Sequence, residues 1–330
     1  MPYRYVPMLK TKAGEVDALT NLNPGVKQRV LPVFHVTTSV APSFAPGIGA
    51  AWANRSAAVD GSFSFNTSGG AATFSHVVQN LRQHSVRAYP SIDVNAPANL
   101  VAAAANLVGA DGVMVRTSLA ALGNVGAFLS QQGWQAGSVD LVIDAGHVAA
   151  LPVSLLANLV ANTLNQQIPA NSPYRSVTLS AAAAPKDHGD LPRGRSDVPR
   201  HDWELWSAVY PNVPFQLDYA DYGTGHPDLT EPPGVAMASA TVSARYTGAT
   251  DWLIIKGRRT TGAQGLPMPQ QYRAHAAHYV ADQQFGGLQN CWGDDRIRQI
   301  DAGTSRPGNR QSWVAIAANR HISMVVSQLP

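Results

Sequence analysis

The chain has 330 residues, of which 45% are hydrophobic and 14% charged, and its formal net charge is +3. This composition is typical of a folded globular protein, and so small a net charge argues against a nucleic acid as a partner. The start of the chain lacks the apolar region of a signal peptide, and no run of about 18 apolar residues offers a membrane span, so we expect no membrane partner.

The chain contains a single cysteine, Cys291. One cysteine excludes an internal disulfide and any cysteine-rich zinc site. We therefore expect a reducing, cytoplasmic location.

Short apolar segments alternate with helix-like segments along most of the chain. This alternation predicts parallel strands joined by crossover helices. We expect strands at residues 3–10, 29–38, 86–94, 112–118, 139–146, 176–182 and 213–222, with helices at 13–22, 73–84, 96–108, 118–132, 151–166 and 199–210.

The pattern changes after residue 239. Residues 240–259 contain two strand-like runs separated by "TGAT", which predicts an antiparallel hairpin, and we expect one of its arms to be the eighth strand of a barrel. A helix at 269–285 and a final strand at 322–329 follow. The whole chain is thus predicted to be one domain, 1–330, with a TIM-like (β/α)8 barrel at about 3–285 and a lid or strand extension at about 286–330.

Two long stretches interrupt this scheme. Residues 39–72 are rich in Ser, Ala, Gly and Asn, and residues 183–201 are charged and rich in proline. Loops of this length inside a compact domain are functional or mobile. Because both follow predicted strands directly, we expect them on the C-terminal face of the barrel.

Ionisable residues stand near the ends of several predicted strands, and active sites of such barrels are built at the C-terminal face. We expect this face to gather acid/base candidates and residues that hold a ligand. The acid/base candidates are Asp93, Asp144 and Asp218, and the ligand-binding candidates are Lys10, His35, Arg116, Arg245 and Lys256.

A simpler interpretation stays open for each of these residues, since a charge at a strand end also returns the chain to solvent. The sequence shows no nucleotide-binding, P-loop or serine-hydrolase motif. No cofactor is evident. A divalent metal held by Asp144, His147 and neighbouring acids is an alternative, although no characteristic ligand spacing supports it.

Four segments resemble the phage-type beta protein family: "YVPMLKTKAGEVDALTNLNPGVKQRVLPVFHV", "RYTGATDWLIIKGR", "FGGLQNCWGDDRIRQI" and "SWVAIAANRHISMVVSQLP". The resemblance spans nearly the whole chain, and it implies a single barrel-type domain in a phage-related or phage-defence setting. It implies no particular reaction.

Two functions of different classes follow. The first is a barrel that binds a phosphorylated or otherwise anionic small molecule at its C-terminal face and acts on it by acid/base chemistry. The second is a non-enzymatic scaffold that captures a protein partner through residues 39–72 and 183–201.

Overall fold

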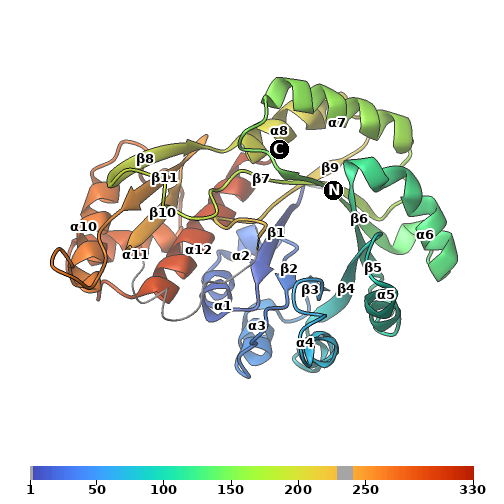
Figure 1. Ribbon diagram of the computed structural model, residues 1–330, viewed down its shortest axis with the longest axis horizontal. Coiled ribbons are helices and arrows are strands. Elements are labelled where there is room, and N and C mark those ends of the chain that lie inside the picture. Colours follow the sequence, from blue (N-terminus) through green and yellow to red (C-terminus); the bar gives the residue numbers. More distant parts are fainter. Residues whose placement is uncertain (1–2, 229–240) are drawn as a thin grey trace.

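The computed structural model describes residues 3–228 and 241–330. Its centre is a closed barrel of parallel strands, surrounded by helices (Figure 1). The strands in order around the barrel are β1 (Tyr5–Lys10), β2 (Val33–His35), β3 (Ser56–Asp60), β4 (Arg87–Asp93), β5 (Val113–Ser118), β6 (Val139–His147), β7 (Ser176–Ala182) and β9 (Leu217–Asp221). The predicted TIM-like (β/α)8 barrel is confirmed.

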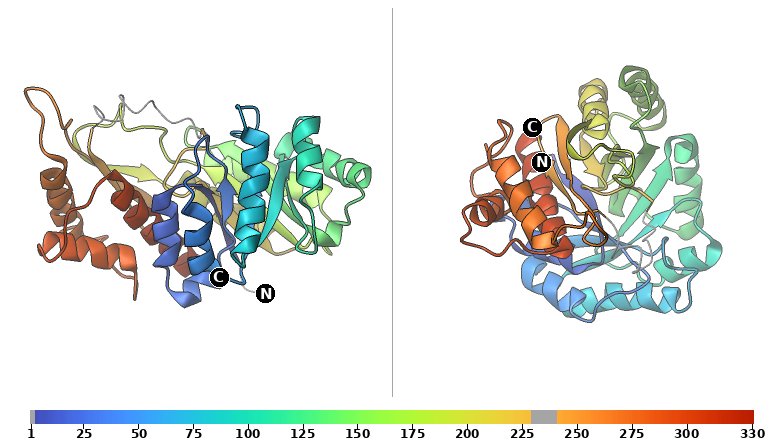
Figure 2. Two further views of the ribbon diagram at one scale, coloured as in Figure 1. Left: turned by 90° about the horizontal axis from the view of Figure 1, so that it is seen from below. Right: turned by 60° about the vertical axis from the view of Figure 1, so that its left-hand side comes forward.

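Helices cover the outside of this barrel (Figure 2). They are α1 (Ala13–Thr20), α2 (Pro24–Lys27), α3 (Phe44–Trp52), α4 (Gly70–Gln83), α5 (Ala98–Ala105), α6 (Val125–Gln132), α7 (Val153–Gln167) and α8 (His201–Val209). Short 3-10 turns lie at Leu119–Asn124, Ala136–Ser138 and Tyr210–Asn212.

Alternation of side chains along each strand produces the two apolar layers. One set, including Met8, Val33 and Met114, fills the barrel interior. The other set, including Leu9 and Phe34, packs outward against the helices. Strands buried on both faces read as nearly continuous apolar runs, which explains why the sequence located seven of them.

The eighth strand of the barrel was predicted wrongly. It is not an arm of the hairpin but β3, which lies inside the stretch at 39–72 that we expected to be irregular. That stretch also contains α3. The strand sequence "SAAVD" is rich in alanine, which has a weak preference for strands, so its composition resembled that of a loop.

The hairpin itself is confirmed, with β10 (Ser243–Thr247) antiparallel to β11 (Asp251–Lys256). It lies beside the barrel in a separate sheet, which we call the side sheet, in the order β10, β11, β8 (Figure 1). Strand β8 (Gly194–Pro199) comes from the stretch at 183–201, so this stretch too is not wholly irregular. Helices α10 (Met268–Val280) and α11 (Trp292–Asp301) lie at the end of the molecule opposite α5 and α6 (Figure 1).

The last prediction, a strand at 322–329, was wrong. These residues belong to α12 (Arg310–Gln328), a helix that begins with a capping box formed by Asn309 and Ser312. The helix packs against α1 on one side and β10 on another, so it is buried around most of its circumference. Such burial removes the helical spacing of apolar residues and leaves a β-branched run that is typical of a strand.

The last barrel strand ends at Asp221, so the elements outside the barrel begin well before residue 286. Among the described residues, no helix has the length and apolar character needed to cross a membrane.

Candidate functional site

The C-terminal ends of the barrel strands gather a group of polar side chains, which we call the mouth cluster. It consists of His35 on β2, Asp60 on β3, Arg116 on β5, Asp144 on β6 and Tyr222 just after β9. Side chains alternate along a strand, and each of these five lies on the same side of its strand as the apolar residues that fill the barrel. All five therefore point inward and lie together above the apolar interior.

Arg116 is the centre of the mouth cluster. Its Nη1 donates to Asp60 Oδ2 at 2.8 Å, and its Nη2 donates to Asp144 Oδ2 and to the Tyr222 hydroxyl, each at 3.0 Å. The Tyr222 hydroxyl donates to Asp144 Oδ2 at 2.8 Å. One guanidinium therefore fixes two carboxylates on opposite sides, and the side chains of Arg116 and Asp144 keep 13% and 18% of their surface exposed.

Burial and the charge of Arg116 set the protonation states of Asp60 and Tyr222 in the mouth cluster. Burial alone would raise the pKa of the Asp60 carboxyl, but the charge of Arg116 and a hydrogen bond from the backbone N–H of Ser62 hold that pKa well below its usual range. Burial raises the pKa of Tyr222. Asp60 is thus an anion and Tyr222 a neutral donor near pH 7.

His35 is neutral in the same range. Burial lowers its pKa to about 4, and the positive charges of Arg116 and Lys10 act in the same direction. Its Nδ1 lies 4.0 Å from Asp60 Oδ1, and its ring stacks on that of Tyr222 with centroids 6.0 Å apart. The imidazole is therefore held in one orientation as an uncharged group.

Three buried polar atoms at this end of the barrel have no hydrogen-bond partner among the described residues: His35 Nε2, Arg116 Nε and Ser180 Oγ. Ser180 lies on β7 beside Asp144 in the strand register and, like its neighbour Ala182, faces the interior. Buried polar atoms are nearly always paired, so orphans from three different strands indicate that this end of the barrel is built to receive another polar group.

Lys10 and Asp93 are also at this end. Lys10 ends β1 opposite His35 in the register, and Asp93 ends β4 opposite Arg116. The Asp93 carboxylate accepts a hydrogen bond from the backbone N–H of Asn95 at 2.8 Å, which shapes the turn after β4.

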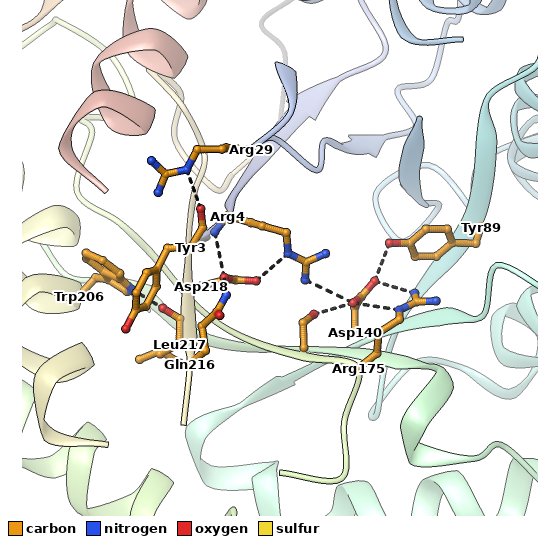
Figure 3. Close-up of polar contacts among 11 residues, drawn as sticks. Tyr3, Arg4, Arg29, Tyr89, Asp140, Arg175, Trp206, Gln216, Leu217 and Asp218 are labelled. Atoms are coloured by element: carbon orange, nitrogen blue, oxygen red, sulfur yellow. Dashed lines mark hydrogen bonds and ion pairs between the residues drawn. The ribbon is translucent and has the colours of Figure 1, made fainter. Parts of the chain in front are cut away.

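Asp218, by contrast, was assigned to the wrong end of the barrel. It is the second residue of β9, and its carboxylate accepts hydrogen bonds from the backbone N–H and the Nε of Arg4, at 2.9 and 2.8 Å. Arg4 in turn approaches Asp140, which also binds Arg175 and the Tyr89 hydroxyl (Figure 3). Asp218 thus belongs to an ion network at the N-terminal end, where residues of such barrels serve stability.

The prediction misplaced Asp218 because the start of its strand was predicted too early. The apolar run at 213–222 predicts one strand, whereas the strand begins only at Leu217, so Asp218 stands near its start. Asp221, the other acid in this segment, faces outward and accepts hydrogen bonds from Tyr219 and from His321 of α12.

Arg245 and Lys256 are not in the mouth cluster either. Both lie on the side sheet and bind the segment that follows β7. Arg245 donates to His188 and Pro185, and Lys256 donates to the carbonyl oxygens of Gly189 and Leu191.

Asp60 and Tyr222 were missed as site residues. Asp60 was missed because its strand was not recognised. Tyr222 was included in the predicted strand, and its hydroxyl gave no signal distinct from that of Tyr219. In the described residues, 3–228 and 241–330, no group of three or more His, Cys, Asp or Glu side chains is placed to hold a metal ion.

The comparison with protein families agrees with the resemblance seen in the sequence. A family model described as Beta protein matches residues 5–327. The chain belongs to the beta protein family. No curated protein matches the chain.

Arg320, in one of the segments that resemble the family, has structural contacts. The buried Arg320 donates to Asp294 Oδ2 at 2.8 Å and to the carbonyl oxygens of Thr247 and Gly286. These bonds fasten α12 to α11 and to the side sheet. The resemblance therefore includes residues that hold the fold together.

Proposed function

We propose that the mouth cluster binds a small anionic molecule and acts on it by acid/base chemistry. The observation that carries this proposal is the set of three unpartnered buried atoms on three strands, next to an arginine and a carboxylate that reach solvent. An anionic group of the ligand would meet Arg116 Nε, the Ser180 hydroxyl and Lys10, all of which are donors.

The remaining residues supply proton transfer. Neutral His35 offers Nε2 as an acceptor when its proton is on Nδ1, the nitrogen nearest Asp60. Tyr222, kept protonated by burial, is a donor, and Asp144 is a partly exposed carboxylate beside it. A base, an acid and an anion site within one cluster are the groups that a proton abstraction next to an acidic group requires.

Besides Lys10 and His35, three of the residues first proposed for this function keep a role in it. Asp144 remains the acid/base candidate and Arg116 an anion-binding residue that also holds the two carboxylates in place. Asp93 stays a candidate at the rim of the mouth. A divalent metal at this face of the barrel stays a prediction.

A screen of nucleotides, sugar phosphates and dicarboxylates by thermal shift, followed by calorimetry, tests the proposal. Ser180→Ala removes only a hydroxyl that has no partner in the part of the chain that the structure describes. The folded protein should therefore be unharmed, while ligand affinity falls about fivefold, the effect of one hydrogen bond. His35→Gln should weaken binding as well. Ser130→Ala on α6, an exposed serine, is the matched control. Equal affinity in Ser180→Ala, His35→Gln and the control would contradict the proposal.

The alternative function, a scaffold that captures a protein partner through residues 39–72 and 183–201, stays a prediction. Residues 39–72 supply a barrel strand and residues 183–201 supply an edge of the side sheet. Because deleting either stretch would damage the fold, surface substitutions outside these strands are the appropriate test.

We further propose, on the strength of family membership, a phage-related or phage-defence setting and a cytoplasmic location. Comparing phage infection in cells with and without the protein tests the setting. An unchanged infection yield over a panel of phages would count against it.

A further inference from the structure

The two faces of the side sheet differ in character. One face carries Ala244, Tyr246 and Leu253 and packs with α10, α11 and α12 in an apolar cluster. On the opposite face, Trp252 and Ile254 join the core of the barrel. Residues that pair across strands share a face, so Ser243, Arg245, Lys256 and Ser196 also lie on this barrel-facing side.

The segment that follows β7 lies against this face and is tied to it. Arg245 Nε donates to His188 Nε2 at 2.8 Å, and Lys256 Nζ donates to Gly189 and Leu191 at 2.7 and 2.6 Å. Burial lowers the pKa of His188 to about 3, and the charge of Arg245 adds to this effect. His188 is thus a neutral acceptor, and this contact leaves the charge of Arg245 uncompensated.

Among the described residues, no carboxylate forms an ion pair with Arg245. Its two printed contacts, His188 and the Pro185 carbonyl, are both neutral, and burial lowers the pKa of Arg245 to about 10. A largely buried guanidinium without an anion is costly, because the charge loses its hydration and receives no ion pair in return. The arginine still retains partial exposure, so a ligand can reach it.

The surroundings of Arg245 contain further donors. Ser243, two residues away on the same face, has a buried hydroxyl with no partner among the described residues. Lys256 stands directly opposite Ser243 in the register, and the two carbonyl bonds leave one of its three ammonium hydrogens for another acceptor. In an antiparallel sheet these three residues lie within about 8 Å of one another along and across the strands.

The nearby carboxylates do not pair with Arg245. Lys186 pairs with Asp228, and the Asp187 carboxylate accepts a hydrogen bond from Gly189 N–H within its own turn. The segment also contains Asp190, so three carboxylates equal in number the cations Arg245, Lys256 and Lys186, but among the described residues none of the three forms an ion pair with Arg245.

We propose that this face of the side sheet is a phosphate-binding site, formed by Arg245, Ser243 and Lys256 under the segment at 185–191. The guanidinium and hydroxyl donate to the oxygens of a phosphate or phosphomonoester, as arginine and serine do in phosphate sites generally. The site is separate from the mouth cluster and does not depend on the function proposed for it.

Calorimetric titration of the full-length protein with inorganic phosphate, and separately with glycerol 2-phosphate, tests the proposal. Arg245→Gln should weaken binding at least tenfold, and Ser243→Ala severalfold. Arg195→Gln is the matched control for charge, because Arg195 lies on the same sheet but pairs with Asp197 and Asp282. Ser196→Ala is the control for loss of an unpartnered hydroxyl two strands away.

Saturable binding that is lost in Arg245→Gln and weakened in Ser243→Ala, with both controls unchanged, supports the site. Tighter binding of glycerol 2-phosphate than of phosphate identifies an organic phosphomonoester as the ligand class, and the reverse identifies the free ion. Absence of saturable binding, or an equal loss in Arg195→Gln, overturns the proposal. If Arg245→Gln does not fold, Ser243→Ala against Ser196→Ala decides the question.

Discussion

At the N-terminal end of the barrel, Asp140 receives hydrogen bonds from Arg175, Tyr89 and Ser176, and Asp218 receives two from Arg4. At the C-terminal end, Arg116 also binds two carboxylates, but three buried polar atoms, one of them its own Nε, have no partner in the described part of the chain. Both ends contain aspartates, arginines and a tyrosine. The difference is whether every donor and acceptor is satisfied, and this separates an end that stabilises the barrel from one suited to a ligand.

The largest effect should come from the N-terminal end. Asp140→Ala leaves Arg175 and the buried Tyr89 hydroxyl without their acceptor, so the free energy of unfolding should fall by about 3–5 kcal/mol. Urea denaturation measures this loss. The exposed Asp301→Ala is the control and should change stability by less than about 0.5 kcal/mol. A loss no greater than that of the control would show that the network is not stabilising.

A pH effect of similar size should come from His35. Its pKa is about 4 when folded, against an ordinary value of 6.5, so the unfolded chain takes up the proton first as the pH falls. The stabilisation is complete above pH 6.5 and is lost between pH 6.5 and 4, by about 3 kcal/mol. Denaturation of the wild type and of His35→Gln across this range should show a shallower decline in the variant. Parallel curves would mean that His35 titrates normally in the fold.

Tyr222→Phe should have an intermediate effect. The change removes the hydroxyl that bonds to Arg116 and Asp144 but leaves their ion pair, so we expect a loss of about 1 kcal/mol in unfolding free energy. A loss as large as that of Asp140→Ala would place Tyr222 among the residues that the fold requires.

The smallest effect should be that of Ser180→Ala on stability. Because its hydroxyl has no partner among residues 3–228 and 241–330, its removal should change the unfolding free energy by less than about 0.5 kcal/mol or raise it slightly. A clear loss of stability would mean that this hydroxyl is satisfied in solution, and the contrast between the two ends of the barrel would weaken.

The barrel itself was predictable from the sequence because strands buried on both faces read as apolar runs. The two elements that were predicted wrongly, β3 and α12, depend on contacts between residues distant in the chain. The short β3 is a strand because it pairs with β2 and β4, and its own sequence does not indicate this. The sequence of α12 lacks the helical spacing of apolar residues because the helix is buried on several sides.

The candidate site was predictable only in part. His35, Arg116 and Asp144 were found because each ends a recognisable strand. Asp218 was misplaced because the position of a charge within a strand depends on where the strand begins, and sequence patterns give that boundary poorly. Asp60 was not predicted as a site residue because its strand, β3, was not predicted.

The position of α12 has a consequence for synthesis of the protein. This helix, close to the end of the chain, packs on α1, and Asn319 donates to the carbonyl oxygen of Ala18 at 3.0 Å. On the ribosome, the part of α1 that α12 covers therefore stays exposed to water until α12 itself has emerged, about 290 residues after α1. We expect the nascent barrel to need protection from aggregation during that interval.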